Sequence, residues 1–68
     1  MKNTIRIERA VLDITQEELA KRVNVSRQTI NTIEAGKYVP STVLALKIAK
    51  TFNKAVEDIF ALEESDWK

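Results

Sequence analysis

The stretch TQEELAKRVNVSRQTINTIEAGK, residues 15–37, predicts two short helices joined by a tight turn. Its first part opens with a capping box: the Thr15 hydroxyl can accept from the Glu18 amide, and the Glu18 carboxylate can reach back to the Thr15 amide. Asn24 ends this part, because asparagine tolerates the left-handed backbone conformation that follows a helix. We therefore expect a helix over about residues 16–23.

A second helix should follow at once. Ser26 is a favourable N-cap, Ile30 and Ile33 supply a buried stripe, and Gly36 is a natural stop, so this helix should span about residues 27–35. Four polar side chains remain on the face that the stripe leaves free: Arg27, Gln28, Asn31 and Thr32. An exposed helix with such side chains can enter the major groove of DNA and contact base edges there.

The stretch resembles the helix-turn-helix of the Cro/repressor-type family, also called the XRE family, of bacterial, phage and archaeal regulators. A collinear series of segments carries the resemblance over nearly the whole chain: residues 15–20, 25–30, 33–37 with Pro40, 44–49 and 57–60. The resemblance implies an all-α, five-helix lambda-repressor-like DNA-binding domain. Small members of the family can add a short β-ribbon between the chain ends, which here would pair residues 1–3 with residues 61–63.

Three further helices complete the expected scaffold. In the first, four apolar side chains are candidates for burial: Ile5, Ile7, Val11 and Leu12. The fourth helix starts after Ser41 and runs to about Phe52, with inward-facing residues Val43, Leu44, Leu46, Ile48 and Ala49. The fifth, about residues 56–62, lacks a good cap at Ala55, so we expect packing or a partner to hold it.

Composition fits a single small helical domain over residues 1–68, without cysteine and without an apolar run long enough to cross a bilayer. The formal net charge is only +1, but residues 1–50 carry nine Lys/Arg against five Asp/Glu, whereas residues 51–68 carry two against five. This asymmetry suits a domain whose first three helices face phosphates, although an ordinary solvated surface would also account for it. The expected location is the cytoplasm, in association with the nucleoid.

The resemblance assigns DNA contacts to both helices of the motif. Arg27 could pair with guanine O6 and N7, and Gln28 with adenine N6 and N7, while Asn31 and Thr32 could contact bases or phosphates. Candidate phosphate ligands are Gln16, Ser26, Thr29, Lys37 and Tyr38. Gln16 matches the glutamine with which the family clamps the DNA backbone at the start of the second helix.

Arg9 and Glu34 match positions that the family often pairs as arginine and glutamate. We interpret them as a partly buried salt bridge that fixes the recognition helix rather than as a reading or catalytic pair. Removal of one partner should then cost more than an exposed ion pair contributes, because the other charge would remain buried and unpaired.

The residue inventory argues against an enzyme. The chain has no histidine and no cysteine, so the usual general base, the thiolate nucleophile and most zinc sites are excluded. A single glycine also excludes a glycine-rich phosphate loop. We expect no catalytic residue, no metal, no cofactor, no small-molecule ligand and no membrane partner.

One short recognition helix contacts few bases, so the expected unit is a homodimer on a two-fold symmetric DNA operator. The C-terminal segment, about residues 56–68, is the best candidate for dimerisation because it lies far from the recognition helix in sequence. Its candidate interface residues are Ile59, Phe60, Leu62 and Trp67. For Trp67 taken alone, packing on the core of its own chain is the more common arrangement, and the need for a dimer is what favours a partner contact.

Three functions remain open at this point. The leading hypothesis is a sequence-specific transcriptional regulator, most simply a repressor that occupies a promoter. The second is an antitoxin or similar protein-binding partner that autoregulates its operon through the same helix-turn-helix. The third is a helix-turn-helix protein that mediates only protein contacts, but such a protein would not need Arg27, Gln28, Gln16 and Lys37 on one face.

Overall fold

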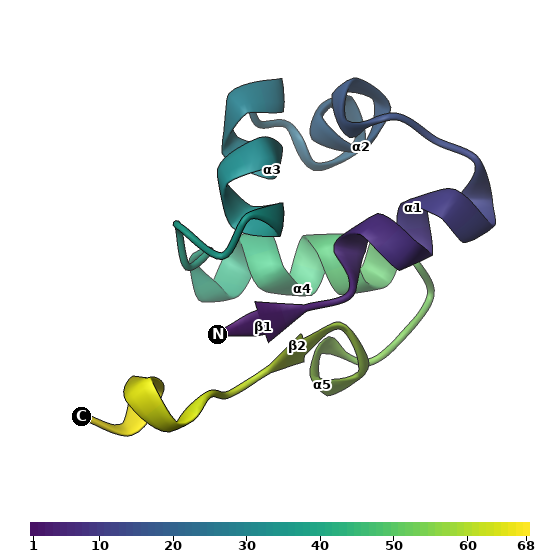
Figure 1. Cartoon of the computed structure of the whole chain (residues 1–68). Helices are drawn as coiled ribbons and strands as arrows, with labels where there is room; N and C mark the ends of the chain where they lie inside the picture. The colour runs from purple at the N-terminus through teal and green to yellow at the C-terminus, as the bar shows by residue number, and fades with distance from the viewer.

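A computed structural model describes all 68 residues and has the expected all-helical architecture with a small antiparallel sheet (Figure 1). The elements are, in chain order, β1 (Lys2–Asn3), α1 (Ile5–Leu12), α2 (Gln16–Val23), α3 (Arg27–Glu34), α4 (Thr42–Thr51), α5 (Val56–Ile59), β2 (Phe60–Ala61) and the 3-10 helix η1 (Glu64–Trp67). Five α-helices with this order confirm the lambda-repressor-like fold class. None of the helices has the length and apolar character needed to span a membrane.

Side-chain hydroxyls begin the three central helices. The amides of Glu18, Thr29 and Leu44 donate to the hydroxyls of Thr15, Ser26 and Ser41 over 3.0, 3.1 and 3.2 Å. The α2 boundaries are those that the sequence predicts. The predicted second hydrogen bond of the capping box is absent, however. The Glu18 carboxylate accepts from Arg22 Nη2 at 3.4 Å rather than from the Thr15 amide.

Residues with a left-handed backbone conformation follow the ends of four helices. Asn24 and Asn53 have φ angles of 60° and 56°, and Gly36, just past α3, has a φ angle of 75°. Asp13 takes the same conformation, with a φ of 56°, at the end of α1. A short polar side chain tolerates this conformation, so three helices stop without glycine.

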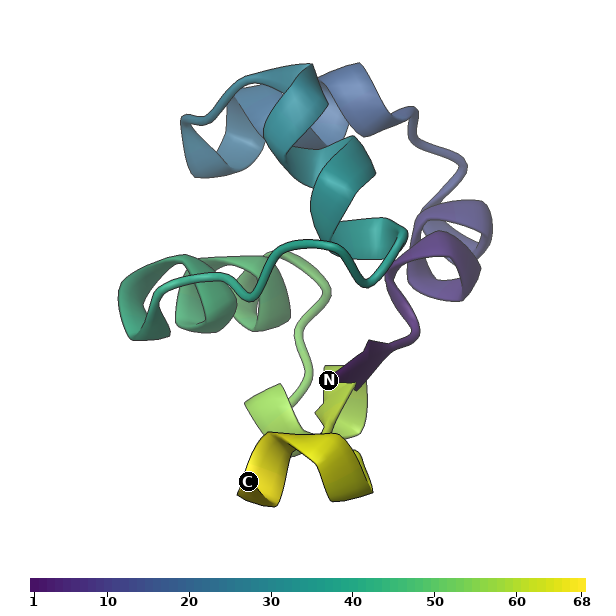
Figure 2. The same ribbon diagram turned by 60° about the vertical axis from the view of Figure 1, so that its left-hand side comes forward.

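The core consists of thirteen buried apolar side chains: Ile5, Ile14, Leu19, Ala20, Val23, Ile30, Ile33, Leu44, Ile48, Ala49, Phe52, Ile59 and Phe60. Every α-helix contributes at least one of them. The helix-turn-helix packs on one side of α4, and α5 and the chain ends lie at the opposite end of the molecule (Figures 1 and 2).

Five apolar side chains that were predicted to be buried are exposed instead. Ile7 and Val11 are 62% and 73% exposed, and Leu12, Val43 and Leu46 are also exposed. In α1 the core-facing side is formed by Ile5 and, one turn later, by Glu8, which is buried. Ile7, two positions after Ile5, points to the other side of the helix. Val11 lies in the last turn of α1 and is also exposed.

The two ends of the chain form the expected β-ribbon in a different register. Lys2 pairs with Ala61 and Asn3 with Phe60. α5 therefore ends at Ile59 rather than at residue 62, because Phe60 adopts an extended backbone, with φ −117° and ψ 138°, to join the ribbon. The tail then forms η1, which the sequence does not predict.

Candidate nucleic-acid interface

α3 separates an apolar side from a polar side. Ile30 and Ile33 are fully buried against the core, whereas Arg27, Gln28 and Asn31 are exposed and Thr32 is half-buried. Figure 2 shows α3 on the outside of the molecule, in front of α2. The four predicted base-reading side chains therefore come from one outward-facing stretch of helix. The hydroxyl of Thr32 donates locally to the carbonyl oxygen of Thr29, at 2.9 Å.

A bidentate ion pair holds the end of α3 against α1. Arg9 Nε lies 2.6 Å from Glu34 Oε2, and Arg9 Nη2 lies 3.1 Å from Glu34 Oε1. Arg9 Nη1 also donates to the carbonyl oxygen of Ile14 at 3.1 Å. The Glu34 side chain is 2% exposed and that of Arg9 is 16% exposed. The planar guanidinium thus links α1, the α1–α2 connection and α3, as the sequence analysis expects of this pair.

Gln16 points inward, toward α3. Its Nε2 donates to Glu34 Oε1 at 3.3 Å and to Asn31 Oδ1 at 3.4 Å. Both side-chain hydrogens are therefore used within the protein. A phosphate at the start of α2 would have to be bound by backbone amides of the first turn rather than by the Gln16 side chain.

The other candidate phosphate ligands fall into two groups. The hydroxyls of Ser26 and Thr29 lie 2.9 Å apart and bond to each other, so local capping accounts for both. Lys37 and Tyr38 follow α3 directly and are exposed. Their side-chain polar atoms make no hydrogen bond or ion pair within the chain, so both are available to a partner.

Basic residues around α3 differ in how they are neutralised. Lys21 and Arg22 on α2 each pair with a glutamate one turn earlier, Glu17 and Glu18. Arg27 and Lys37, at the start and just past the end of α3, have no acidic partner within 4 Å. A cation without an acidic partner therefore stands at the start and just past the end of the helix that presents the polar face.

Two polar residues, Asn3 and Glu8, make tertiary contacts that were not predicted from the sequence. Asn3 Nδ2 donates to the carbonyl oxygen of Ile33 at 2.9 Å, and Asn3 Oδ1 accepts from the Ile5 amide at 3.2 Å. The buried Glu8 accepts from Lys54 Nζ at 2.9 Å, across 46 residues of sequence. The one available signal for Asn3 is its suitability as a helix cap, and Glu8 carries no signal because a glutamate in a first turn is ordinary.

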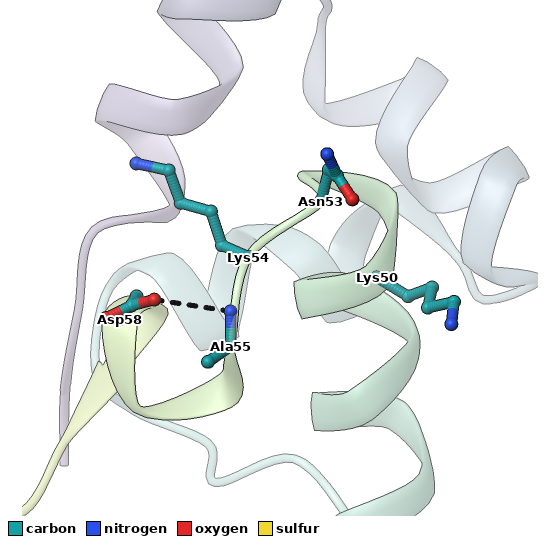
Figure 3. A pocket seen from close by; sticks show the side chains of 5 residues that line it. All are labelled: Lys50, Asn53, Lys54, Ala55 and Asp58. Atoms are coloured by element: carbon teal, nitrogen blue, oxygen red, sulfur yellow. Dashed lines mark hydrogen bonds between the residues drawn. The ribbon is translucent and has the colours of Figure 1, made fainter.

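The largest hollow in the molecule, about 630 Å³ in volume, does not form a second site. It is lined by Lys50, Asn53, Lys54, Ala55 and Asp58, around the turn between α4 and α5 (Figure 3). The Ala55 amide donates to Asp58 Oδ2 at 3.3 Å, and the two lysines extend to opposite sides rather than toward a common point. No cluster of His, Cys, Asp and Glu side chains in the molecule could hold a metal ion.

The candidate dimer residues divide between the core and the surface. Ile59 and Phe60 are buried in the core of their own chain, at 1% and 7% exposure. The prediction that they form part of a dimer surface is therefore wrong. Their burial follows from the ribbon, which places β2 beside β1 over the core. Leu62 and Trp67 are 59% and 78% exposed. They belong to the C-terminal segment, which lies at the end of the molecule opposite to α3 (Figure 1).

Comparison with known proteins agrees with this geometry. A helix-turn-helix family model matches residues 5–59. An uncharacterized HTH-type transcriptional regulator of Methanocaldococcus jannaschii is 54% identical over 97% of this chain and 100% of its own length. A similar regulator of Archaeoglobus fulgidus is 53% identical over 97% of this chain and 93% of its own length, and YgzD of Bacillus subtilis is 50% identical over 97% and 100%. The chain therefore belongs to the XRE family of helix-turn-helix transcriptional regulators.

Proposed function

We propose that this protein is a sequence-specific DNA-binding transcriptional regulator that inserts α3 into the major groove. The observation that carries the proposal is the division of α3: its isoleucines are buried, while Arg27, Gln28 and Asn31 are exposed. The free cations Arg27 and Lys37 at the two ends of this helix supply the attraction to phosphates that precedes base reading. The relatives named as transcriptional regulators support the same role.

Base reading is assigned to Arg27, Gln28, Asn31 and Thr32. Arg27, in the first turn, suits guanine, and Gln28 has both its amide groups free for adenine. Thr32 presents its methyl group to a base, because its hydroxyl is bonded to the backbone of α3. Phosphates are bound by Lys37, Tyr38 and the backbone amides that begin α2. The protein performs no catalysis in this proposal and acts on DNA in the cytoplasm.

The proposed functional unit is a homodimer on a two-fold symmetric operator. α3 has eight residues and is about 12 Å long, so it spans only a few base pairs. Two copies with recognition helices about 34–36 Å apart would reach successive turns of one DNA face. We assign dimerisation to residues 56–68, with Leu62 and Trp67 as its exposed apolar side chains. Occupation of a promoter by such a dimer represses transcription directly.

Selection from a random DNA pool tests the proposal. Purified protein should enrich one palindromic sequence whose half-sites are separated by about one helical turn. Sedimentation of the protein with that DNA should give two chains per duplex, and replacement of Leu62 and Trp67 by serine should give one chain per duplex at the same protein concentration. A pool without any enriched sequence would overturn the DNA-reading role, and a single asymmetric site would overturn the dimer.

A further inference from the structure

Four polar side chains form a continuous chain of hydrogen bonds from α1 to the exposed face of α3. We call this chain the Gln16 relay; it comprises Arg9, Glu34, Gln16 and Asn31. Arg9 donates twice to Glu34, Gln16 Nε2 donates to Glu34 Oε1, and Gln16 Nε2 also donates to Asn31 Oδ1. The relay begins in the protein interior and ends at a side chain that faces solvent.

The orientation of every member follows from the first pair. A guanidinium can only donate and an ionised carboxylate can only accept, so Glu34 offers Gln16 nothing but acceptor oxygens. A Gln16 amide turned by 180° would place its own oxygen against that carboxylate. Gln16 therefore directs its nitrogen inward and has its second hydrogen left for Asn31.

The same matching of donors to acceptors fixes the orientation of the Asn31 side-chain amide. With Gln16 Nε2 as a neighbour, the Asn31 amide places its oxygen toward Gln16, because the opposite orientation would bring two NH₂ groups together. The Asn31 NH₂ group, with two hydrogens, then remains on the exposed side of α3. Asparagine normally reads adenine with both its oxygen and its nitrogen, and here the oxygen is already engaged.

We infer that Asn31 acts toward DNA as a hydrogen-bond donor only and selects guanine over adenine, with Gln16 as the positioning residue that sets this preference. Guanine presents two acceptors, O6 and N7, in the major groove, whereas adenine presents one acceptor and one NH₂ donor that would oppose the Asn31 NH₂. This inference rests on the proposed DNA-reading function. It also gives Gln16 a role in base choice in place of phosphate binding by its side chain.

The experiment starts from the sequence that the wild-type protein enriches from a random pool. The base pair that depends on Asn31 is the one whose preference disappears in Asn31→Ala. At that position the wild type should bind guanine about tenfold more tightly than adenine. Replacement of the guanine by 7-deazaguanine, which lacks the N7 acceptor, should weaken wild-type binding severalfold and leave Asn31→Ala unchanged.

Gln16→Met is the decisive variant, because it preserves side-chain length and leaves the Arg9–Glu34 pair in place. Asn31 can then rotate, so the guanine preference should fall to about twofold as adenine binding improves. Glu17→Gln, on the neighbouring exposed position of α2, is the matched control and should keep the tenfold ratio. In the free protein, Gln16→Met should shift the side-chain amide resonances of Asn31 in a ¹⁵N NMR spectrum, whereas Glu17→Gln should not.

The outcomes separate the inference from the proposed function. Three outcomes would each overturn the inference about the relay. The enriched sequence could carry adenine at the Asn31-dependent position, or the guanine-to-adenine affinity ratio could stay unchanged in Gln16→Met. Asn31→Ala could also lose affinity without losing any base preference. Unchanged Asn31 side-chain resonances in free Gln16→Met protein would also overturn the relay, in an experiment that needs no DNA. A pool that yields no enriched sequence would instead refute the DNA-reading function itself.

Discussion

Asn3 Nδ2 lies 2.9 Å from the carbonyl oxygen of Ile33, so a residue of β1 caps the last turn of the recognition helix. The same oxygen accepts from the Gly36 amide at 3.0 Å. The carbonyl groups of a last helical turn lack partners within the helix, and here the N-terminal strand supplies one of them. The β-ribbon therefore also supports the end of α3 that precedes Lys37 and Tyr38, the proposed phosphate ligands.

Asn3→Ala should destabilise the protein by about 1–2 kcal/mol, because it removes two hydrogen bonds and leaves the Ile5 amide without its acceptor. Urea unfolding measures this loss. The amides of Gly36 and Lys37 should also exchange faster with solvent, since the last turn of α3 opens more readily. Lys2→Ala, at the neighbouring exposed position of β1, is the control, and equal exchange rates in the two variants would contradict the capping role.

Arg9→Met should cost about 3 kcal/mol of unfolding free energy, because the buried Glu34 would keep only the exposed Arg6, at 3.8 Å, and the uncharged Gln16 as partners. The double variant Arg9→Met/Glu34→Leu should recover a large part of this loss, since neither charge is then buried alone. Arg22→Met removes an exposed pair with Glu18 and should change stability by less than about 1 kcal/mol. Similar losses for Arg9→Met and Arg22→Met would show that the Arg9 pair is no stronger than a surface pair.

Local chemistry explains why the helix-turn-helix could be predicted from sequence. Thr15, Ser26 and Ser41 bond to amides three residues later, and Asn24 tolerates the conformation that ends α2, so neighbouring residues alone determine these boundaries. The exposed face of α3 follows from the positions of its two isoleucines. The part of the site that depends on helix periodicity was therefore accessible without a structure.

Long-range pairs explain what could not be predicted. Glu8 is buried on the core-facing side of α1 and pairs with Lys54, 46 residues away, whereas Ile7 and Val11 are exposed. Gln16 turns inward because Arg9 holds Glu34 beside it. No local pattern encodes the direction of a glutamine amide, so its orientation becomes evident only when the helices are packed.

The tail has a pH dependence of its own. In protein that begins at Met1, hydrogen bonds to the carboxylates of Glu63 and then Asp66 raise the pKa of the amino group above its ordinary value of about 8. The hydrogen bond from the Glu63 amide, at 2.7 Å, and then the amino group lower the pKa of Asp66 below its ordinary value of about 4. Both shifts favour the charged forms, which hold η1 against the N-terminus.

The signs of the two shifts define the range over which η1 is held. The contribution of the amino group is complete below about pH 8 and is lost as the pH rises through its raised pKa. The contribution of Asp66 is complete above about pH 4 and is lost as the pH falls through its lowered pKa. The Glu63 amide resonance should therefore titrate with a midpoint below the ordinary aspartate value, and Asp66→Asn should abolish this transition. A midpoint at or above the ordinary value would contradict the contact.

Arg27→Ala and Lys37→Ala should weaken DNA binding in different ways. Arg27→Ala should cost about 1–3 kcal/mol and relax the preference at one base pair, because a base contact carries sequence information. Lys37→Ala should weaken binding to all sequences alike and reduce the slope of log affinity against log salt concentration by about 1, because a phosphate contact releases one counterion. Gel-shift titrations at several salt concentrations measure both effects, with Lys50→Ala, beside the α4–α5 turn, as the control. Equal salt slopes for wild type and Lys37→Ala would remove Lys37 from the phosphate contacts, and an unchanged base preference in Arg27→Ala would remove Arg27 from base reading.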